Sequence, residues 1–166
     1  MRNKVYLDWS AVENGGGHEA GRALLARMYR QATGKPLPEI RVTDRGKPFF
    51  PESAWHFSIS HTPRHVFCAL TLCPVGIDCE EMDRPVRPQL AKKVMSTEEL
   101  LRWEQSADKN RAFLRLWVLK EAAAKLTGEG LRGYPNHTDF DPEDSRVREI
   151  AGCYVAVLTE EENNAV

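Results

Sequence analysis

The sequence lacks long hydrophobic runs, cysteine pairs of the CxxC type and any excess of one charge. Of its 166 residues, 42% are hydrophobic and 28% are charged, and the formal net charge is -1. No apolar run approaches the roughly 20 residues that span a bilayer, and residues 1–8 contain no apolar core of signal-peptide length. A nearly neutral chain has no general affinity for nucleic acid or anionic membranes, so any anion site must arise from a local cluster.

Cysteine and histidine usage gives no metal-binding motif. The cysteines lie in apolar, strand-like surroundings, which predicts buried, reduced thiols in a cytoplasmic protein; they are Cys68, Cys73, Cys79 and Cys153. Three histidines are close in sequence, namely His56, His61 and His65. On a strand, the odd offset places His56 and His61 on opposite faces, and no cysteine stands beside them at a ligand spacing. We therefore do not favour a zinc site there.

Hydrophobic periodicity and turn residues predict a mixture of helices and strands. Alternating or continuous apolar runs indicate strands at residues 5–9, 40–42, 56–60, 66–72, 75–80, 147–150 and 154–158. Helical patterns cover residues 18–32, 89–95 and 108–127, and a capping box starts another helix at residues 96–99. We expect residues 44–48 to form a turn and residues 160–166 to be disordered. Because strands and helices do not alternate strictly, the order favours an α+β fold in one domain or two very small lobes.

Two acidic residues on one predicted strand are the first candidates for chemistry. Asp78 and Glu80 are separated by one residue, so they share a strand face with backbones about 6.6 Å apart. Cys79 points the other way, into the core. Both carboxylates could reach one cation, or they could form a polar strand end that faces water.

The long predicted helix adds a third carboxylate. Glu121 follows Phe113 and Trp117 on an apolar face, so its side chain should approach the core. Lys125 lies one turn later on the same face. The alternative is an exposed Glu–Lys pair worth about 0.2–0.5 kcal/mol.

Acidic and basic candidates together indicate a phosphate site built around a metal. Magnesium prefers a few carboxylates, with water and substrate phosphate completing its shell. Without a cation, each close pair of like charges would cost about 4 kcal/mol at an effective dielectric of 20. Basic or donor groups are available at Lys47, Ser60, His61 and Lys125, although His61 could equally be an ordinary histidine at a strand end. We therefore predict transfer of a phosphate-linked group from a nucleotide-like donor.

Three motifs, in this order, resemble the 4′-phosphopantetheinyl transferase superfamily, in its larger, surfactin-synthetase-activating branch. The first motif is GKPF at residues 46–49 followed by FSISHT at residues 57–62. The second is VGIDCE at residues 75–80. The third is WVLKEAAAK at residues 117–125, with GEGL at residues 128–131. The resemblance runs from about residue 21 to residue 158.

This resemblance implies a fold and an activity. The fold would be two similar α+β lobes related by a pseudo-twofold axis, residues 1–73 and 74–166, in a monomer with coenzyme A between the lobes. The enzyme would be a magnesium-dependent transferase of the holo-[acyl-carrier-protein] synthase type. It would move 4′-phosphopantetheine from coenzyme A to a serine of an apo acyl or peptidyl carrier protein and release adenosine 3′,5′-bisphosphate.

The resemblance also implies residue roles. Asp78, Glu80 and Glu121 would hold Mg²⁺, and Glu121 would also be the base for the serine hydroxyl. Lys125 would steady the pyrophosphate. The coenzyme A phosphates would contact Lys47, Ser60 and His61.

Two basic regions extend these predictions. Residues 11–21 offer only His18 for the 3′-phosphate of coenzyme A, so Arg22 and Arg45 are the nearest substitutes. The densest basic stretch could dock an acidic carrier protein or could be a solvated surface; it comprises Arg84, Arg87, Lys92 and Lys93. Two other functions stay open: a noncatalytic relative that binds coenzyme A or a carrier protein, and an unrelated magnesium phosphoesterase.

Overall fold

The computed structural model describes residues 4–130 and 138–160, and it confirms the α+β fold class. The strands are β1 Tyr6–Ala11, β2 Arg41–Val42, β3 Pro48–Phe49, β4 His56–His61, β5 His65–Thr71, β6 Val75–Glu81, β7 Val147–Ile150 and β8 Cys153–Thr159. The helices are α1 Gly17–Thr33, α2 Pro88–Val94, α3 Thr97–Gln105 and α4 Lys109–Thr127. None of these helices is long and apolar enough to cross a bilayer.

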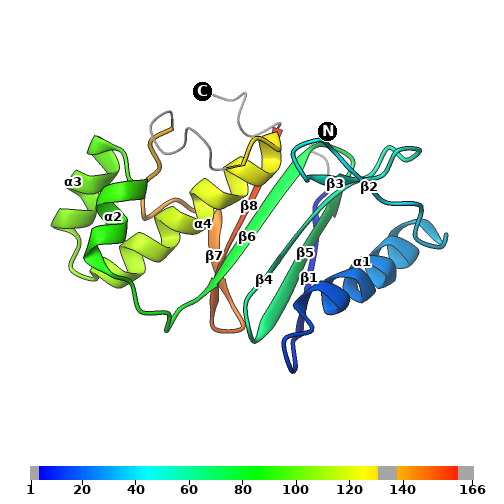
Figure 1. The fold of residues 1–166 in the computed structure, drawn as a ribbon, viewed down its shortest axis with the longest axis horizontal. Helices are drawn as coiled ribbons and strands as arrows, with labels where there is room; N and C mark the ends of the chain where they lie inside the picture. The colour runs from blue at the N-terminus through cyan, green and yellow to red at the C-terminus, as the bar shows by residue number, and fades with distance from the viewer. Residues whose placement is uncertain (1–3, 131–137, 161–166) are drawn as a thin grey trace.

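The chain repeats one topology twice (Figure 1). One antiparallel sheet has the order β1-β5-β4, and the other has the order β6-β8-β7. Each half has additions: the β2–β3 pair follows α1, and α2 and α3 precede α4. Apart from these, the chain runs strand, helix, strand, strand in each half, and the last strand lies in the middle of its sheet. The two-lobe division that we propose, at residues 73 and 74, falls between the end of β5 and the start of β6.

Local sequence signals explain where the helices begin and end. The predicted cap is present at α3, where Ser96 Oγ accepts a hydrogen bond from the Glu99 amide at 3.2 Å. The Asp108 carboxylate accepts one from the Arg111 amide at 2.9 Å at the start of α4. Helices α1 and α4 end at Gly34 and Gly128, whose φ angles of 73° and 74° suit glycine.

Two details differ from the sequence prediction. Residues 48 and 49 form the short strand β3, which pairs with β2, although we expected a turn through residue 48. Two-residue strands are too short to show alternation. Glu160 is ordered and not part of a disordered tail, because its amide donates to the Pro74 carbonyl at 3.2 Å. The rest of the predicted tail, residues 161–166, lies outside the described residues.

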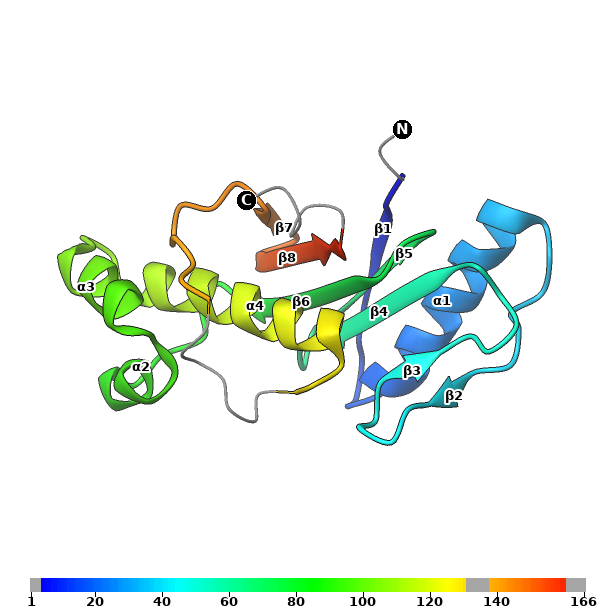
Figure 2. The same ribbon diagram turned by 90° about the horizontal axis from the view of Figure 1, so that it is seen from above.

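The two sheets meet where β4 runs beside β6 (Figure 2). Serine hydroxyls join these strands: Ser58 Oγ accepts from the Ile77 amide at 3.1 Å, and Ser60 Oγ accepts from the Cys79 amide at 3.3 Å. A separate apolar core fills the space between the sheets; it comprises Phe67, Ala69, Val75, Ile77, Cys79, Cys153 and Val155. The seam is therefore held by hydrophobic contact and by side-chain hydrogen bonds to the backbone.

Helix α4 packs directly on β6 because of Gly76. A Cβ atom on this buried residue would lie 2.0 Å from the Ala122 carbonyl oxygen and 2.5 Å from the Leu126 nitrogen. No other amino acid permits such a close approach of helix and strand. This contact brings the acidic face of β6 up to the face of α4 that carries Glu121 and Lys125.

The four cysteines match their prediction. All of them are free and buried in the structure. Burial raises the pKa of the Cys68 and Cys79 thiols to about 12, so both are neutral and packed as small apolar side chains.

Candidate active site

A groove runs along the junction of β4, β6 and α4. It consists of two adjoining hollows, which share Ile59, Glu121 and Lys125 as lining residues. The more polar hollow has a volume of about 450 Å³ and is also lined by Ser60, His61, Asp78, Cys79, Glu80, Arg84 and Trp117. The other, of about 260 Å³, is also lined by Arg45, Gly46, Lys47, Pro48, Phe57, Ser58, Ala124, Gly128 and Gly130.

Asp78 is the most enclosed carboxylate of the groove, with 7% of its surface exposed. Its Oδ1 atom lies 2.8 Å from Lys125 Nζ and accepts a hydrogen bond from Ser60 Oγ at 2.9 Å. Burial raises the pKa of Asp78, and the neighbouring lysine and serine only partly oppose that rise. The seam serine thus connects β4 to the acidic residue of β6.

Glu80 also faces the groove, where it forms an ion pair with Arg84. Burial raises the pKa of Glu80, against the opposing charge of Arg84. From the sequence, Arg84 was expected only in the carrier-docking stretch, and its contact with Glu80 was not predicted. A spacing of four residues predicts a side-chain pair only within a helix. Glu80 and Arg84 lie on either side of the end of strand β6, so their spacing did not predict this contact.

Glu121 reaches the same groove from α4. Burial raises the pKa of Glu121 to about 7, and the negative charge of Asp78 adds to the rise. The apolar face predicted from Phe113 and Trp117 exists: Phe113 is fully buried, and the two rings are stacked with centroids 6.0 Å apart. A carboxyl group whose pKa lies near neutrality is suited to accept a proton.

The three carboxylates fit a hard divalent cation by their chemistry. All their donors are oxygen, which magnesium prefers. The hollow places these three carboxylates beside two cationic side chains, Lys125 and Arg84. Burial raises the pKa of each carboxyl group, so ionising all three there is costly without a further cation. A bound cation would supply that positive charge.

Three predicted contacts of coenzyme A also line the groove. Ser60 and His61 end β4, and the His61 ring lies so close to α1 that a Cβ on Gly17 would be 2.5 Å from its Nδ1 atom. Lys47 lines the less polar hollow, and its Nζ donates to the Leu126 carbonyl at 2.6 Å. Burial lowers the pKa of Lys47.

The two arginines proposed for the 3′-phosphate lie in different places. Arg45 lines the groove and forms an exposed ion pair with Glu129 at 3.6 Å. Arg22 is on α1 and is not among the groove-lining residues. The structure therefore brings Arg45, but not Arg22, to the other predicted side chains.

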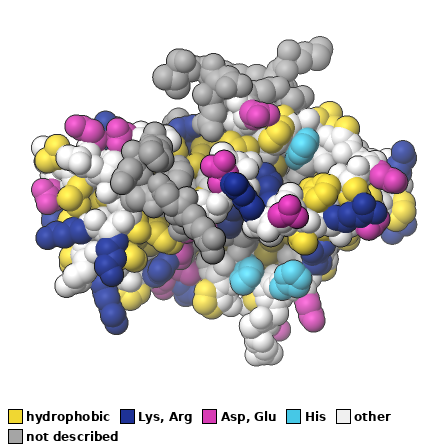
Figure 3. All heavy atoms as spheres, turned by 45° about the horizontal axis from the view of Figure 1, so that its top comes forward, with side chains coloured by type: hydrophobic (Ala, Val, Ile, Leu, Met, Phe, Trp, Pro, Cys, Tyr) yellow, Lys and Arg dark blue, Asp and Glu magenta, His cyan; other side chains and the backbone are white. Residues whose placement is uncertain are grey.

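The basic stretch borders the groove. A recess of about 600 Å³ lies between residues 84–87 and α2, lined by Arg84, Pro85, Val86, Arg87, Gln89, Leu90 and Lys93. Lys92 is exposed on the same helix. Figure 3 shows lysine and arginine side chains gathered on the side of the molecule formed by α2 and α3. Arg84 lines both this recess and the acidic groove.

Comparison with known proteins identifies the family of this chain. Residues 74–163 match the model of the 4′-phosphopantetheinyl transferase superfamily. The 4′-phosphopantetheinyl transferase psf-1 of Bacillus pumilus is 34% identical over 118 residues, which cover 67% of this chain and 49% of the relative. The 4′-phosphopantetheinyl transferase Sfp of Bacillus subtilis strain 168 is 33% identical over 113 residues, covering 66% and 49%. HetI of Nostoc, also a 4′-phosphopantetheinyl transferase, is 33% identical over 123 residues, covering 68% and 52%.

The chain spans about half the length of these curated relatives. The matched family region includes β6 and α4, which carry the acidic residues of the groove. Both the family match and the identity to these relatives support the resemblance drawn from the three sequence motifs. The chain belongs to the 4′-phosphopantetheinyl transferase superfamily, in the branch that includes Sfp.

Proposed function

We propose that this chain transfers 4′-phosphopantetheine from coenzyme A to a serine of an apo carrier protein and releases adenosine 3′,5′-bisphosphate. The proposed enzyme is a cytoplasmic, magnesium-dependent monomer of the holo-[acyl-carrier-protein] synthase type. One observation carries the proposal: in a member of this superfamily, Asp78, Glu80, Glu121 and Lys125 line one groove where the two sheets meet.

In this proposal, Asp78, Glu80 and Glu121 would hold magnesium. When bound there, the ion would offset negative charge on the pyrophosphate of coenzyme A. Lys125, now 2.8 Å from Asp78, has the reach to neutralise a phosphate oxygen in the same hollow.

The other groove residues would bind and orient the donor. Ser60 and His61 present a hydroxyl and an imidazole at the end of β4. Lys47 would contact a phosphate once its ammonium leaves the Leu126 carbonyl. This exchange is favourable because the ammonium is partly buried, as its lowered pKa reflects, and a charged acceptor stabilises it more than a neutral carbonyl does. Arg45, which lines the groove, and Arg22, which lies on α1, are the proposed partners for the 3′-phosphate.

Glu121 is proposed as the proton acceptor. The oxygen of the carrier serine would form a bond to the phosphorus atom that bears the pantetheine arm, and the bond from that phosphorus to the bridging oxygen would break. The proton of the serine hydroxyl would pass to Glu121, directly or through water, and adenosine 3′,5′-bisphosphate would depart with the bridging oxygen. A placed carboxylate contributes about 10²–10⁴-fold to such a step.

We further propose that Arg84, Arg87, Lys92 and Lys93 dock an acidic carrier protein. Arg84 supports this proposal because it borders both the basic recess and the acidic groove, so a carrier seated on the recess would stand beside Glu80. Replacing Lys92 and Lys93 with Glu should raise the KM for the carrier and leave the KM for coenzyme A unchanged. Lys35→Glu, a reversal on the other lobe, is the control. Equal effects on both substrates would contradict the docking role.

Mass measurement of carrier proteins tests the function itself. The protein is incubated with coenzyme A, magnesium and several apo carriers, and each carrier is weighed before and after the reaction. The proposal predicts the gain of one phosphopantetheine, abolished by EDTA. Release of free phosphate without a mass gain would instead indicate a phosphoesterase. Binding of coenzyme A with no mass change on any carrier would indicate a noncatalytic relative.

A further inference from the structure

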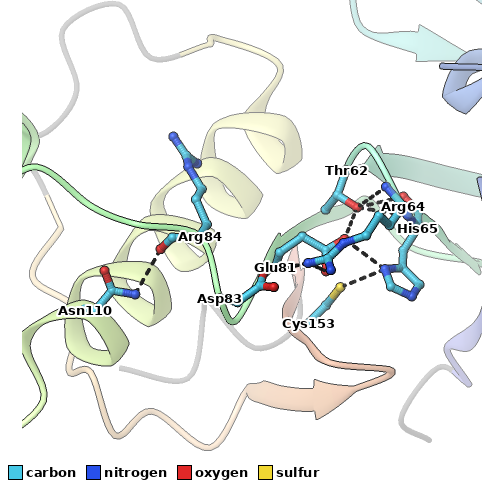
Figure 4. A network of polar contacts seen from close by, with 8 residues as sticks. All are labelled: Thr62, Arg64, His65, Glu81, Asp83, Arg84, Asn110 and Cys153. Carbon is cyan, nitrogen blue, oxygen red and sulfur yellow. Dashed lines mark hydrogen bonds and ion pairs between the residues drawn. The ribbon is translucent and has the colours of Figure 1, made fainter. Parts of the chain in front are cut away.

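A second cluster of ligand-type side chains lies on the opposite face of β6. His65, Glu81 and Cys153 each offer a donor atom, and these atoms all lie within 4.8 Å of one another. They come from the start of β5, the end of β6 and the start of β8. Figure 4 shows the three side chains pointing toward one another, while the side chain of Arg84 points away from them.

Strand periodicity explains why these residues meet. His65 lies on the same face of β5 as Phe67 and Ala69, and Glu81 lies on the same face of β6 as Ile77 and Cys79. That face is the core between the two sheets. Cys153 is directly opposite Glu81 in the β6–β8 ladder. The cluster therefore closes one end of the inter-sheet core and joins the first sheet to the second.

The donor atoms are close and enclosed. His65 Nδ1 is 2.8 Å from Glu81 Oε1 and 3.5 Å from Cys153 Sγ. Cys153 is fully buried, and the Glu81 and His65 side chains are 9% and 19% exposed. Thr62 donates a hydrogen bond to Glu81 Oε1, and Arg64 donates one to Oε2 at 2.8 Å. These hydrogen bonds hold the Glu81 carboxylate in place, as hydrogen bonds from surrounding residues usually hold metal-binding carboxylates.

This arrangement does not suit a cysteine nucleophile. In a catalytic relay, the nucleophile and the orienting carboxylate contact opposite nitrogens of the histidine ring. Here both Cys153 Sγ and Glu81 Oε1 approach the same nitrogen, Nδ1. Burial also raises the pKa of the Cys153 thiol to about 12, so it does not act as a free thiolate.

We propose that His65, Glu81 and Cys153 form a binding site for a divalent metal of the zinc type, separate from the carboxylate groove. Sulfur, imidazole and one carboxylate together suit zinc or cobalt, whereas the all-oxygen groove suits magnesium. On binding, a metal–sulfur bond forms and the thiol proton of Cys153 passes to solvent. The metal replaces the hydrogen bond between His65 Nδ1 and Glu81, and the Nδ1 proton moves through solvent to Nε2, so that the neutral imidazole ligates through Nδ1. Three protein ligands leave one position for water.

The observed distances fit this geometry with little movement. At ordinary zinc–nitrogen and zinc–sulfur bond lengths, tetrahedral donors stand about 3.5 Å apart for nitrogen and sulfur, and about 3.3 Å apart for nitrogen and oxygen. The structure has 3.5 Å for the first pair and 2.8 Å for the second. Of these two pairs, only the hydrogen-bonded His65–Glu81 pair must open, by about half an ångström. The third pair, Cys153 Sγ and a Glu81 carboxylate oxygen, lies within 4.8 Å.

Because its ligands come from both sheets, the bound metal would hold the seam together. One side of that seam carries this site, and the other side carries Asp78 and Glu80. Metal binding to the folded chain alone raises its stability by mass action. The proposal does not depend on the transferase activity, because its test reads metal binding and not catalysis.

Cobalt provides the test, because thiolate ligation gives it an intense sulfur-to-metal charge-transfer absorption. Metal-stripped protein is titrated with Co²⁺ and the spectrum is recorded. We expect this absorption to saturate at one ion per chain, to vanish when Zn²⁺ displaces the cobalt and to survive excess Mg²⁺. Zn²⁺ should also raise the Tm of the wild-type chain. Ions held by the three carboxylates would not contribute, because carboxylate ligands supply no sulfur.

Two variants and a control localise the signal. Cys153→Ser should abolish the absorption and the zinc-dependent rise in Tm. His65→Gln, which keeps a hydrogen-bonding side chain beside Glu81, should weaken cobalt binding by about tenfold or more and serves if the first variant does not fold. Cys79→Ser removes another thiol of the same core and should keep the absorption. Absence of the absorption in the wild-type chain, or its persistence in Cys153→Ser, would overturn the proposal.

Discussion

Replacing Glu121 with Gln should stabilise the metal-free protein at alkaline pH while strongly lowering its activity. Glu121 is half-buried beside Asp78, and its pKa is raised from 4.5 to about 7. The folded chain therefore binds a proton at this site more tightly than the unfolded chain does. By linkage, the folded state loses stability as the pH rises from about 4.5 to about 7 and does not regain it above that range. Glutamine does not ionise, so the variant escapes this loss.

The size of the effect follows from the pKa. The rise from 4.5 to about 7 corresponds to roughly 3 kcal/mol if fully expressed, at about 1.4 kcal/mol for each pKa unit. Since the side chain is partly solvated, screening reduces this to ~1–2 kcal/mol. For a chain of this size, each kcal/mol changes the Tm by roughly 2–4 °C. We expect the variant to melt about 2–8 °C above the wild type near pH 8, and close to it near pH 4.5.

Thermal unfolding with a chelator present measures this difference across the pH range. Glu104→Gln, which alters an exposed carboxylate of α3, is the control and should not produce a pH-dependent difference. Adding Mg²⁺ near pH 8 should then reverse the order, because the wild type gains more from the cation; a concentration of about 100 times Kd gives ~2.7 kcal/mol. An E121Q variant that is less stable than the wild type at every pH without metal would refute the assignment of Glu121 as an uncompensated buried carboxyl group.

Three further predictions concern the stability of the fold. Gly76→Ala should cost about 1–3 kcal/mol or more in the free energy of unfolding, because its Cβ would meet the backbone of α4; urea unfolding measures this, and a neutral result would contradict the close packing. Lys120 and Glu99 form a buried ion pair at 2.5 Å, so Lys120→Met should lower the free energy of unfolding by ~3–5 kcal/mol. Adding Glu99→Leu should recover most of this loss, because no unpaired charge then stays buried. A double variant that recovers no stability would show that the broken pair is not the cause. Ser96→Ala removes the cap of α3 and should lower stability by about 1 kcal/mol, and an unchanged unfolding midpoint would show that this cap contributes nothing.

Most elements of the fold could be predicted because their signals are local. Helix α4 has an Asp cap before it and a glycine in the left-handed region after it, and the sequence of β4 alternates polar and apolar residues. The pairing of the strands is not local. Placing β5 and β8 in the middle of their sheets depends on contacts between distant segments, and the family resemblance, not the periodicity, supplied the expectation of two similar lobes.

In the candidate site, too, local rules predicted some contacts and could not predict others. Asp78 and Glu80 were expected to share a face because strand residues two apart always do, and both line the groove. The pair between Arg84 and Glu80 depends on how the chain turns after β6, which no spacing rule gives. Likewise, the spacing of histidines and cysteines in the sequence did not favour a zinc site near His65. The cysteine that lies beside His65 in space, Cys153, is 88 residues away in the chain.

The central claim is that this groove transfers phosphopantetheine to a serine. The most direct test is to follow both products in one reaction with coenzyme A, Mg²⁺ and an apo carrier, measuring the mass of the carrier and the amount of adenosine 3′,5′-bisphosphate. Our account predicts equal amounts of modified carrier and adenosine 3′,5′-bisphosphate, none with a carrier whose acceptor serine is alanine, and a rate about 10²–10⁴-fold lower for Glu121→Gln. Formation of adenosine 3′,5′-bisphosphate without modified carrier, or an undiminished rate in Glu121→Gln, would contradict it.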